Sequence, residues 1–505
     1  MSEAFPNISF ELPIAKPKDA AVVVLVRELG PGKREIFWVR RGGRLEFAGG
    51  FYAFPGGKVE RSDAETMIDN CPQGEEAIRV AAIRETFEEI GVLLAPGGDQ
   101  ISSEKLAVAR KSLLDGSPFS SLLKGLGLNL DASILIDAGR WVTPRFSPIR
   151  FDARFYMVRV AAHIDTEILP GELSGGGWID PAEGLALWEQ GQVLLHPPNR
   201  HVLSVLAGNT SEAAIPRLRT PPFVDPEYVV HRIEFQRGVH ILPLRTPTLP
   251  PAQHTNCWLV GTGDFVIIDP GSPRPEEQQR LAELVSEFIS EGGRPIAVLL
   301  THHHIDHVGG ARALAERFNI PIRSSAATAQ RVPGAIGDIN DGDIIELDGP
   351  MPMRLECVLT EGHAQGHLCF IDQASRAIFA GDMVASGTTI VIDPPEGNMG
   401  VYLNSLQRLT ECNIGTIYPA HGFPIPDGPK RLDHYLTHRR MRLDQISSAL
   451  EEAGPMQVEE IVALVYQKTP EFLHPAAARS ALASLIELQE RGVVTKLGNS
   501  WESST

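Results

Sequence analysis

The stretch 299–310, LLTHHHIDHVGG, decides the fold of the middle of this 505-residue chain. It ends the apolar run IAVLLT, which is typical of a buried strand, so its polar residues follow that strand on a loop. Residues two apart in an extended segment face the same side, so His302 and His304 can bind one ion together. Asp306 and His307, where the next helix begins, then turn toward a second ion. These ligands suit zinc, although iron and manganese stay open.

Three later fragments supply the remaining polar residues that a dinuclear site needs. TEGHAQGH contains His363, FAGDMV contains Asp382 and YPAHG contains His421. Each lies at the end of an apolar run or beside a glycine, where a side chain can project into a cleft. A single histidine is usually structural, and we keep that interpretation for His303 and His367. The larger set favours metal binding.

In their order and spacing these residues resemble the metallo-β-lactamase superfamily. The resemblance implies an αββα sandwich, two zinc-type ions and a hydrolase in which Asp306 is catalytic and the ions activate water. It also implies that Asp269 of IIDPGS supports the site without touching an ion. The implied ligands form two sets and a bridge: His302, His304 and His363; Asp306, His307 and His421; and Asp382 between them.

The N-terminal part of the chain carries a second polar pattern, in the helical string AAIRETFEEIGVLL (81–94). Glu85, Glu88 and Glu89 are at positions i, i+3 and i+4, so their carboxylates lie on one helical face. Adjacent anions repel by roughly a few tenths of a kcal/mol per pair unless cations compensate. Mg²⁺ or Mn²⁺ suits such an all-oxygen cluster. Gly91 is placed to end the helix in the left-handed conformation.

Together with the upstream loop FPGGKVE, this helix resembles the Nudix box. The resemblance implies an α/β/α sandwich that hydrolyses a nucleoside diphosphate linked to another group. It also implies that Glu85, Glu88 and Glu89 hold Mg²⁺ or Mn²⁺ and that Glu85 and Glu88 are catalytic. The alternative is an ordinary solvated acidic helix face.

Two departures from the Nudix box stand out. Twenty-six residues separate Gly57 from Arg84, where the box usually has thirteen, and Thr86 replaces an aliphatic residue. A long loop of this kind also occurs in the Nudix branch that includes the peroxisomal coenzyme A diphosphatases. The strings FAGGFYAFPGGKVE, RVAAIRETFEEIGVLL and WVTPRFSPIRFDARFYMV resemble that branch. Whether the enlarged loop leaves the site active stays open.

Other polar residues of this part have two interpretations each. Glu172 in ELSGGGWIDPAEGL is either a further base or ligand, or an ordinary loop acid. Arg145, Arg150 and Arg154 either meet phosphate oxygens or face solvent from strands.

The C-terminal part shows three helical patterns and closes with VVTKLGNSWE, which predicts a winged helix. Together with TNCWLVGTGDFVIIDPG and THRRMRLDQI, it resembles a branch of the metallo-β-lactamase superfamily that carries this module. Some members of that branch cleave single-stranded RNA, and related glyoxalase-II-type enzymes cleave thioesters. From residue 438 onward, seven Lys and Arg stand against nine Asp and Glu, whereas a domain that grips phosphates is expected to be basic. RNA cleavage stays open but is not favoured, and packing or dimerisation is the expected role.

Composition agrees with a soluble multidomain protein. Hydrophobic residues make up 43%, charged residues 22% and the net charge is −17, which argues against non-specific binding to nucleic acid or anionic lipid. Five scattered cysteines without a CxxC pair indicate a reduced setting. The start MSEAFPNISFELPIAKPKDA lacks the features of a signal peptide, and no run is long enough to span a membrane. We expect a cytoplasmic protein that does not bind membranes.

The sequence therefore predicts an α/β and α+β multidomain hydrolase. The expected domains are a Nudix-like domain at 15–225, a metallo-β-lactamase-fold domain at 232–435 and a winged helix at 438–505, with a proline-rich linker near RLRTPPFVDPEY. The expected partners are small-molecule diphosphates or thioesters, and a homodimer stays open. A single-stranded RNA endonuclease with an accessory Nudix half is the alternative, and a half that only binds a regulatory ligand is a third hypothesis.

Overall fold

The computed structural model describes residues 14–504 except 31, 43–48, 148, 170, 250, 251 and 388. The quoted N-terminal start therefore lies outside the described residues up to residue 13. The chain forms two compact units that divide between Arg237 and Gly238, and each is described by itself.

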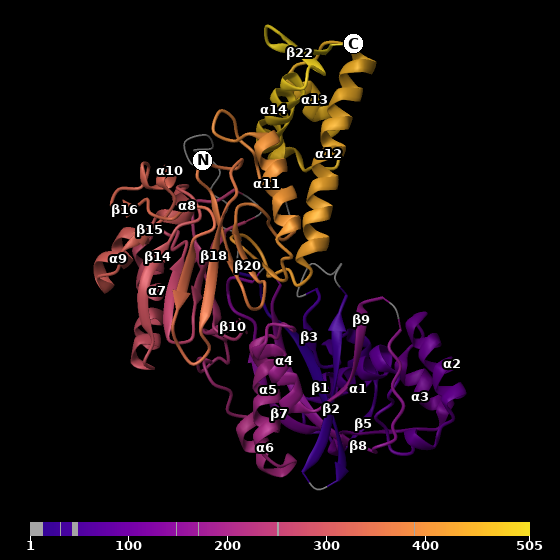
Figure 1. Ribbon diagram of the computed structural model, residues 1–505. Helices are drawn as coiled ribbons and strands as arrows, with labels where there is room; N and C mark the ends of the chain where they lie inside the picture. The colour runs from indigo at the N-terminus through magenta and orange to yellow at the C-terminus, as the bar shows by residue number, and fades with distance from the viewer. Residues whose placement is uncertain are drawn as a thin grey trace. The chain divides into compact units, whose positions relative to one another are not determined.

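A mixed sheet forms the centre of the N-terminal unit (Figure 1). Its strands are ordered β3-β2-β1-β8-β7, with β4 paired to β1 and β9 paired to β2. The expected hairpin of AAVVVLVREL and EIFWVRR is present as antiparallel β1 and β2, while β1 and β8 run parallel. The strands are β1 (Lys18–Gly30), β2 (Lys33–Arg41), β3 (Tyr52–Ala53), β4 (Gly56–Lys58), β7 (Ile136–Val142), β8 (Phe151–Val160) and β9 (Leu173–Ile179).

The acidic helix α1 (Glu76–Ile90) packs one apolar face against this sheet. Ile83, Phe87 and Ile90 are fully buried with Val23 and Leu25 of β1, so the opposite face of α1 is left for the polar residues. The other helices of this unit are α2 (Ser103–Leu114), α3 (Phe119–Leu126), α4 (Pro181–Glu189), α5 (Pro197–Gly208) and α6 (Ser211–Leu218). Short elements are β5 (Ile68–Asp69), β6 (Leu130–Asp131), β10 (Ile233–Gln236) and three 3-10 turns, η1 (Arg61–Glu65), η2 (Gly98–Gln100) and η3 (Ala132–Ile134).

The proline-rich stretch expected as a linker contacts the sheet of this unit. The amide of Val142 donates to the carbonyl of Tyr228 across 2.9 Å, and Val224 pairs with Val230 in an isolated bridge. Residues 219–231 therefore have a defined conformation and run beside β7.

Two sheets face each other in the C-terminal unit. Trp258 of β12 has its ring 4.9 Å from Tyr418 of β21 and 6.0 Å from Phe379 of β20, so the sheets are joined by aromatic packing. The first sheet contains β11 (Val239–Arg245), β12 (His254–Val260), β13 (Asp264–Ile268), β14 (Arg294–Leu299), β15 (Ile322–Arg323) and β16 (Ala335–Ile336). The second contains β17 (Ile344–Leu347), β18 (Met353–Leu359), β19 (Leu368–Asp372), β20 (Ile378–Gly381) and β21 (Ile417–Pro419).

Helices cover the outer face of each sheet, which completes an αββα sandwich. Buried residues of α7 and α9 share a core with the first sheet, and those of α11 and α12 share a core with the second. The helices are α7 (Pro275–Ser290), α8 (Ile305–Val308), α9 (Ala311–Phe318), α10 (Ala326–Ala329), α11 (Met399–Glu411) and α12 (Gly428–Ala453). The expected metallohydrolase architecture is confirmed.

The winged helix is built on the same core as the second sheet. Helix α12 runs without interruption from that sheet to the C-terminal elements, which surround its far end (Figure 1). These are α13 (Val458–Val465), η4 (Glu471–Leu473), α14 (His474–Glu490), β22 (Val494–Leu497) and β23 (Ser500–Ser503). Buried residues of α11, α12, α13 and α14 form one hydrophobic cluster. The three helices and two-stranded wing agree with the sequence prediction.

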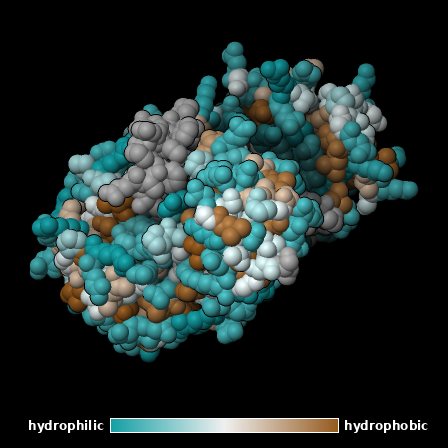
Figure 2. Space-filling view, turned by 90° about the horizontal axis from the view of Figure 1, so that it is seen from above, coloured by the Kyte–Doolittle hydropathy of each residue, from teal (hydrophilic) through white to brown (hydrophobic). Residues whose placement is uncertain are grey.

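The surface is largely polar. On the face shown in Figure 2, hydrophilic residues cover most of the surface and hydrophobic ones form small patches. Among the described residues, no helix combines the length and the apolar character that crossing a bilayer requires.

Candidate active sites

Three histidines converge beyond the ends of the strands of the C-terminal unit. His302 and His304 follow β14, as the sequence predicts, and His363 follows β18. Nδ1 of His304 lies 2.9 Å from Nε2 of His302 and 3.1 Å from Nε2 of His363. Burial, and the neighbouring imidazoles after it, lower the pKa values of His302 and His363, so both rings are neutral. Neutral imidazole is the form that binds metal.

A second group lies beside the first. Asp306 and His307 belong to the short helix α8, and His421 follows β21. Their ligand atoms lie within 4.8 Å of one another, and Nε2 of His421 is 3.6 Å from Oδ2 of Asp306. All three side chains are buried.

Asp382 stands between the two groups. Its Oδ2 is 3.4 Å from Nε2 of His363 in the first group. Its Oδ1 is 3.5 Å from Nε2 of His307 and 3.4 Å from Nε2 of His421 in the second group. The two oxygens of one carboxylate thus face the two groups separately, as a bridging ligand would.

The donor set of the second group fits a cation. Oδ2 of Asp306, Nε2 of His307 and Oδ1 of Asp382 are buried without a hydrogen-bond partner among the described residues. Such atoms are costly unless something binds them. Burial lowers the pKa of His307, but the carboxylates of Asp382, Asp269 and Asp306 raise it to about 10. These carboxylates therefore favour a positive charge at this position. Divalent ions would satisfy all three atoms.

Asp269 supports both groups from outside the ligand set. It follows β13 with a left-handed backbone (φ 52°) and is buried. Its Oδ2 lies 2.8 Å from Nδ1 of His307 and accepts a 2.7 Å hydrogen bond from the hydroxyl of Thr301. Thr301 is in turn 3.0 Å from Nδ1 of His302, so one carboxylate orients a ring in each group. This is the supporting role that the resemblance implied for Asp269.

Two residues near this site were not predicted to take part in it. His367, interpreted as structural, has Nδ1 2.9 Å from the Thr360 hydroxyl, and its Nε2 accepts the amide of Asp382 across 3.1 Å. It therefore fixes the backbone of the bridging residue. Glu396 lies 3.1 Å from Nε2 of His303 and 3.5 Å from Nε2 of His304. No spacing signal in the sequence pointed to Glu396.

In the N-terminal unit, Arg84 pairs with two of the three carboxylates of α1. Its Nη1 lies 3.0 Å from Oε1 of Glu85 and 3.1 Å from Oε2 of Glu88. Glu89 instead accepts the Gly56 amide across 2.9 Å. Burial first, and neighbouring carboxylates after it, raise the pKa of Glu85 to about 7 and of Glu89 to about 8, although Arg84 and the Gly56 amide oppose the shifts. The cluster is therefore short of positive charge, as a divalent-cation site is.

The glycine loop lies against the helix despite the long insertion. A Cβ on Gly57 would be 2.4 Å from the carboxyl carbon of Glu85, so any side chain there would displace that carboxylate. Asp63, in the insertion, is buried, and its oxygens lie 2.7 and 3.0 Å from two nitrogens of Arg84. This contact anchors the inserted residues, and no pattern in the sequence indicated it. Thr86 is accommodated because its hydroxyl donates to the carbonyl of Ala82.

The sequence left two interpretations open for three arginines and for Glu172 of this unit. Arg150 donates to the carbonyls of Thr143 and Ala15, which occupies its guanidinium with the protein itself. Arg145 and Arg154 contact acidic side chains at 3.3 and 3.8 Å. The carboxylate of Glu172 is among the charges that raise the pKa of Glu89, and its backbone carbonyl accepts the Gly42 amide across 2.6 Å. Gly91 ends α1 at φ 75°, as predicted.

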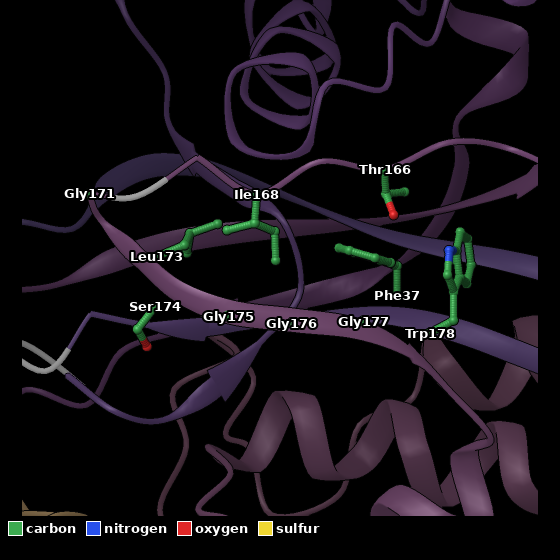
Figure 3. Close-up of a pocket in the computed structure, with 10 residues that line it drawn as sticks. All are labelled: Phe37, Thr166, Ile168, Gly171, Leu173, Ser174, Gly175, Gly176, Gly177 and Trp178. Carbon is green, nitrogen blue, oxygen red and sulfur yellow. The ribbon is translucent and has the colours of Figure 1, made fainter.

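A cavity of about 410 Å³ adjoins β9 (Figure 3). Its floor is the glycine run 175–177, and Phe37, Ile168, Leu173 and Trp178 project into it. Gly171 and Leu173, the two neighbours of Glu172 along the chain, both line this space.

Models of known families match each part of the chain. The metallo-beta-lactamase superfamily matches residues 250–421, and the beta-lactamase associated winged helix domain matches residues 458–501. The NUDT19 Nudix domain matches residues 64–206, and the general NUDIX domain matches residues 16–110.

Individual proteins are similar to parts of the chain. An atrochrysone carboxyl ACP thioesterase of Aspergillus chevalieri is 34% identical over 50% of this chain and 79% of its own length. A beta-lactamase-like protein 2 homolog of Caenorhabditis elegans is 29% identical over 48% of this chain and 81% of its own. A solved NUDIX hydrolase from Alicyclobacillus acidocaldarius is 30% identical over 42% of this chain and all of its own, with a TM-score of 0.37.

Proposed function

This chain belongs to the metallo-beta-lactamase superfamily and joins that domain to a Nudix domain and a winged helix, and from this we propose two separate hydrolytic activities. The C-terminal unit hydrolyses thioesters with two zinc-type ions. The N-terminal unit hydrolyses nucleoside diphosphate conjugates, among them coenzyme A-like diphosphates, with Mg²⁺ or Mn²⁺. The partners are accordingly small-molecule substrates.

One observation carries the proposal: each unit holds its own complete donor set. Seven histidine and aspartate side chains converge in the C-terminal unit, and three glutamates converge in the N-terminal unit. The thioester assignment is supported by the thioesterase that is 34% identical to half of this chain. Bound divalent ions supply Lewis-acid chemistry, which lowers the pKa of water and polarises carbonyl and phosphoryl groups.

The protein's own residues orient the reactants around that chemistry. Asp306, the carboxylate of the second ligand group, orients the attacking water in the C-terminal unit. In the N-terminal unit, the pKa of Glu85 at about 7 suits proton exchange near neutral pH, and Glu88 lies across Arg84 from it. The cavity beside Glu172 gives space to the group attached to the diphosphate.

The charges of the winged helix do not favour RNA cleavage. Four of its basic side chains are bound within the protein: Arg439 to a carbonyl of residue 390, Arg442 to Val465, Arg479 to Asp393, and Arg491 to Glu487. A phosphate-binding surface would need guanidinium groups that are not already paired within the protein.

A substrate panel with single-site variants tests the proposal. Wild type, Glu88→Gln and His304→Ala are assayed against coenzyme A thioesters, nucleoside diphosphate conjugates and single-stranded RNA. Glu76→Gln, exposed on the same helix as Glu88, and His434→Ala, exposed on α12, are the matched controls. We expect diphosphate hydrolysis to be lost only in Glu88→Gln and thioester hydrolysis only in His304→Ala. RNA cleavage that disappears in His304→Ala, without thioester turnover in wild type, would replace the thioester assignment.

A further inference from the structure

The segment 390–396, IVIDPPE, lies between the metal-binding histidines and the C-terminal helices. It has no regular secondary structure, yet Ile390 and Ile392 are buried in the core that α12 and α14 share. It contacts the histidines on one side and the C-terminal helices on the other.

On one side, Glu396 faces the outer nitrogen of a proposed ligand. Nδ1 of His304 points at the other two histidines, so an ion bound at Nδ1 would leave the proton of the ring on Nε2. That Nε2 lies 3.5 Å from Oε2 of Glu396, while Oε1 lies 3.1 Å from Nε2 of His303. A carboxylate at the second nitrogen of a metal-binding imidazole fixes the ring and increases its basicity.

The same segment holds a second histidine of the group. Nδ1 of His363 lies 3.0 Å from the carbonyl oxygen of Val391, which leaves Nε2 for the ion. Two of the three rings that converge on one ion are therefore oriented by residues five positions apart in one segment, and only His302 depends on Thr301.

On its other side, the segment is attached to α12 and α14. Arg439 of α12 donates to the carbonyl of Ile390, and the amide of Ile392 donates to the Ser480 hydroxyl across 3.3 Å. Arg479 binds the carboxylate of Asp393, and its Nη2 donates to the carbonyl of Pro394 across 3.2 Å. These contacts fix four of the six positions that precede Glu396 in the segment.

We propose that Glu396 is a positioning residue for His304, and that the C-terminal helices act on the metal centre through segment 390–396. This inference rests on the metal centre of the proposed function. It gives the winged helix a role within its own unit: it holds the two oxygens that orient His304 and His363.

Zinc affinity, measured on the full chain by competition with a chromophoric chelator, tests the role of Glu396. We expect Glu396→Ala to bind zinc about 10–100-fold more weakly than wild type, Glu396→Gln to fall between them, and Glu396→Asp to recover part of the loss. Glu346→Gln, which removes an exposed carboxylate paired with Arg354, is the matched control and keeps wild-type affinity. The cobalt-substituted protein should show a changed visible spectrum in Glu396→Gln, because the ring of His304 is no longer held.

Two arginine variants test the link between segment 390–396 and the C-terminal helices. Arg479→Ala should weaken zinc binding in the same direction as Glu396→Gln. Arg491→Ala, directly after the same helix but paired with Glu487 at 2.6 Å, should leave zinc binding unchanged.

The outcomes separate this inference from the proposed function. A wild-type chain that binds no zinc contradicts the metal centre itself. Zinc affinity in Glu396→Ala and Glu396→Gln equal to that of Glu346→Gln overturns only the positioning role. A loss of one bound ion per chain in Glu396→Ala, with the other ions bound at wild-type affinity, would make Glu396 a ligand and also overturn it. Loss of zinc in Arg491→Ala equal to that in Arg479→Ala would overturn the link to the helices.

Discussion

Nδ1 of His307 lies 2.8 Å from Oδ2 of Asp269, and both side chains are buried. This contact turns Nε2 of the same ring toward Asp382, 3.5 Å away. Asp269 also receives the hydroxyl and the amide of Thr301, so the loop that begins the metal-binding stretch is bound to the end of β13. The first prediction concerns this carboxylate.

Asp269→Asn should weaken zinc binding about 10–100-fold, because an amide cannot accept hydrogen bonds at both positions where the carboxylate does. The measurement is zinc affinity by chelator competition. Asp264→Asn, at the opposite end of β13 and paired with Arg294 at 2.6 Å, is the control. Equal affinities in the two variants would contradict the supporting role of Asp269.

Zinc should stabilise the C-terminal unit through the second group of ligands. Zinc at a hundred times its dissociation constant adds about 2.7 kcal/mol to the unfolding free energy of a protein that binds it only when folded. Thermal melting of wild type after chelation should therefore shift upward when zinc returns. In His421→Ala the shift should be smaller, and an undiminished shift would exclude His421 as a ligand. His434→Ala is the control.

Asp63→Ala should destabilise α1, because it leaves the buried guanidinium of Arg84 without its main partner. Removing one member of a buried ion pair costs about 3–5 kcal/mol. Hydrogen–deuterium exchange of the α1 amides in the full chain measures the effect. Glu212→Gln breaks an exposed pair with Arg159 and should leave the protection of the α1 amides unchanged. Unchanged protection in Asp63→Ala would show that the insertion is not anchored there.

The pH dependence of the N-terminal unit follows from the raised pKa values of Glu85 and Glu89, about 7 and about 8. The folded state holds more protons than the unfolded state between the ordinary glutamate pKa and these values. The contribution of these two groups to stability therefore falls as pH rises through this window in the metal-free protein. Mn²⁺ must displace the protons, so its affinity should rise from pH 6 to pH 8.5. Calorimetric titration in two buffers of different ionisation enthalpy measures the released protons. Affinity that does not change with pH would contradict the assignment.

Gly57→Ala should weaken Mn²⁺ binding, because the added methyl group would displace the Glu85 carboxylate. Overpacking of this kind typically costs about 1–3 kcal/mol. Gly177→Ala is the matched control, since a Cβ at that position meets nothing within 4 Å. Equal Mn²⁺ affinity in the two variants would show that the glycine loop does not position Glu85.

Much of the architecture could be predicted because strand ends and helix faces are local features. His302 and His304 are placed by two-residue spacing after an apolar run, and Glu85, Glu88 and Glu89 by helical periodicity. The structure brings these residues together within their own units, and it sets Asp382 between the two groups of ligands. The predicted hairpin, sandwich and winged helix are present as well.

The supporting contacts could not be predicted, because they depend on tertiary packing between distant segments. Asp63 and Glu396 are acids in loops with no periodicity, and nothing local distinguishes them from solvated residues. His367 was interpreted as structural, yet its bond to the Asp382 amide is visible only once β19 and β20 are paired. The proline-rich stretch looked like a linker because its contacts with β7, such as that of Arg219 with Asp137, join segments that are far apart in the sequence.

The insertion between Gly57 and Arg84 has an evolutionary consequence. The amide of Gly56 is bound to Glu89, and Asp63 is bound to Arg84, so the chain is fixed to α1 at both points. Doubling the length of a flexible loop costs only about 0.6 kcal/mol of closure entropy. A change in the number of residues between Asp63 and α1 would therefore cost little free energy of folding as long as both contacts are kept. In homologous chains these two contacts would mark the helix better than the number of residues between the glycine and the arginine.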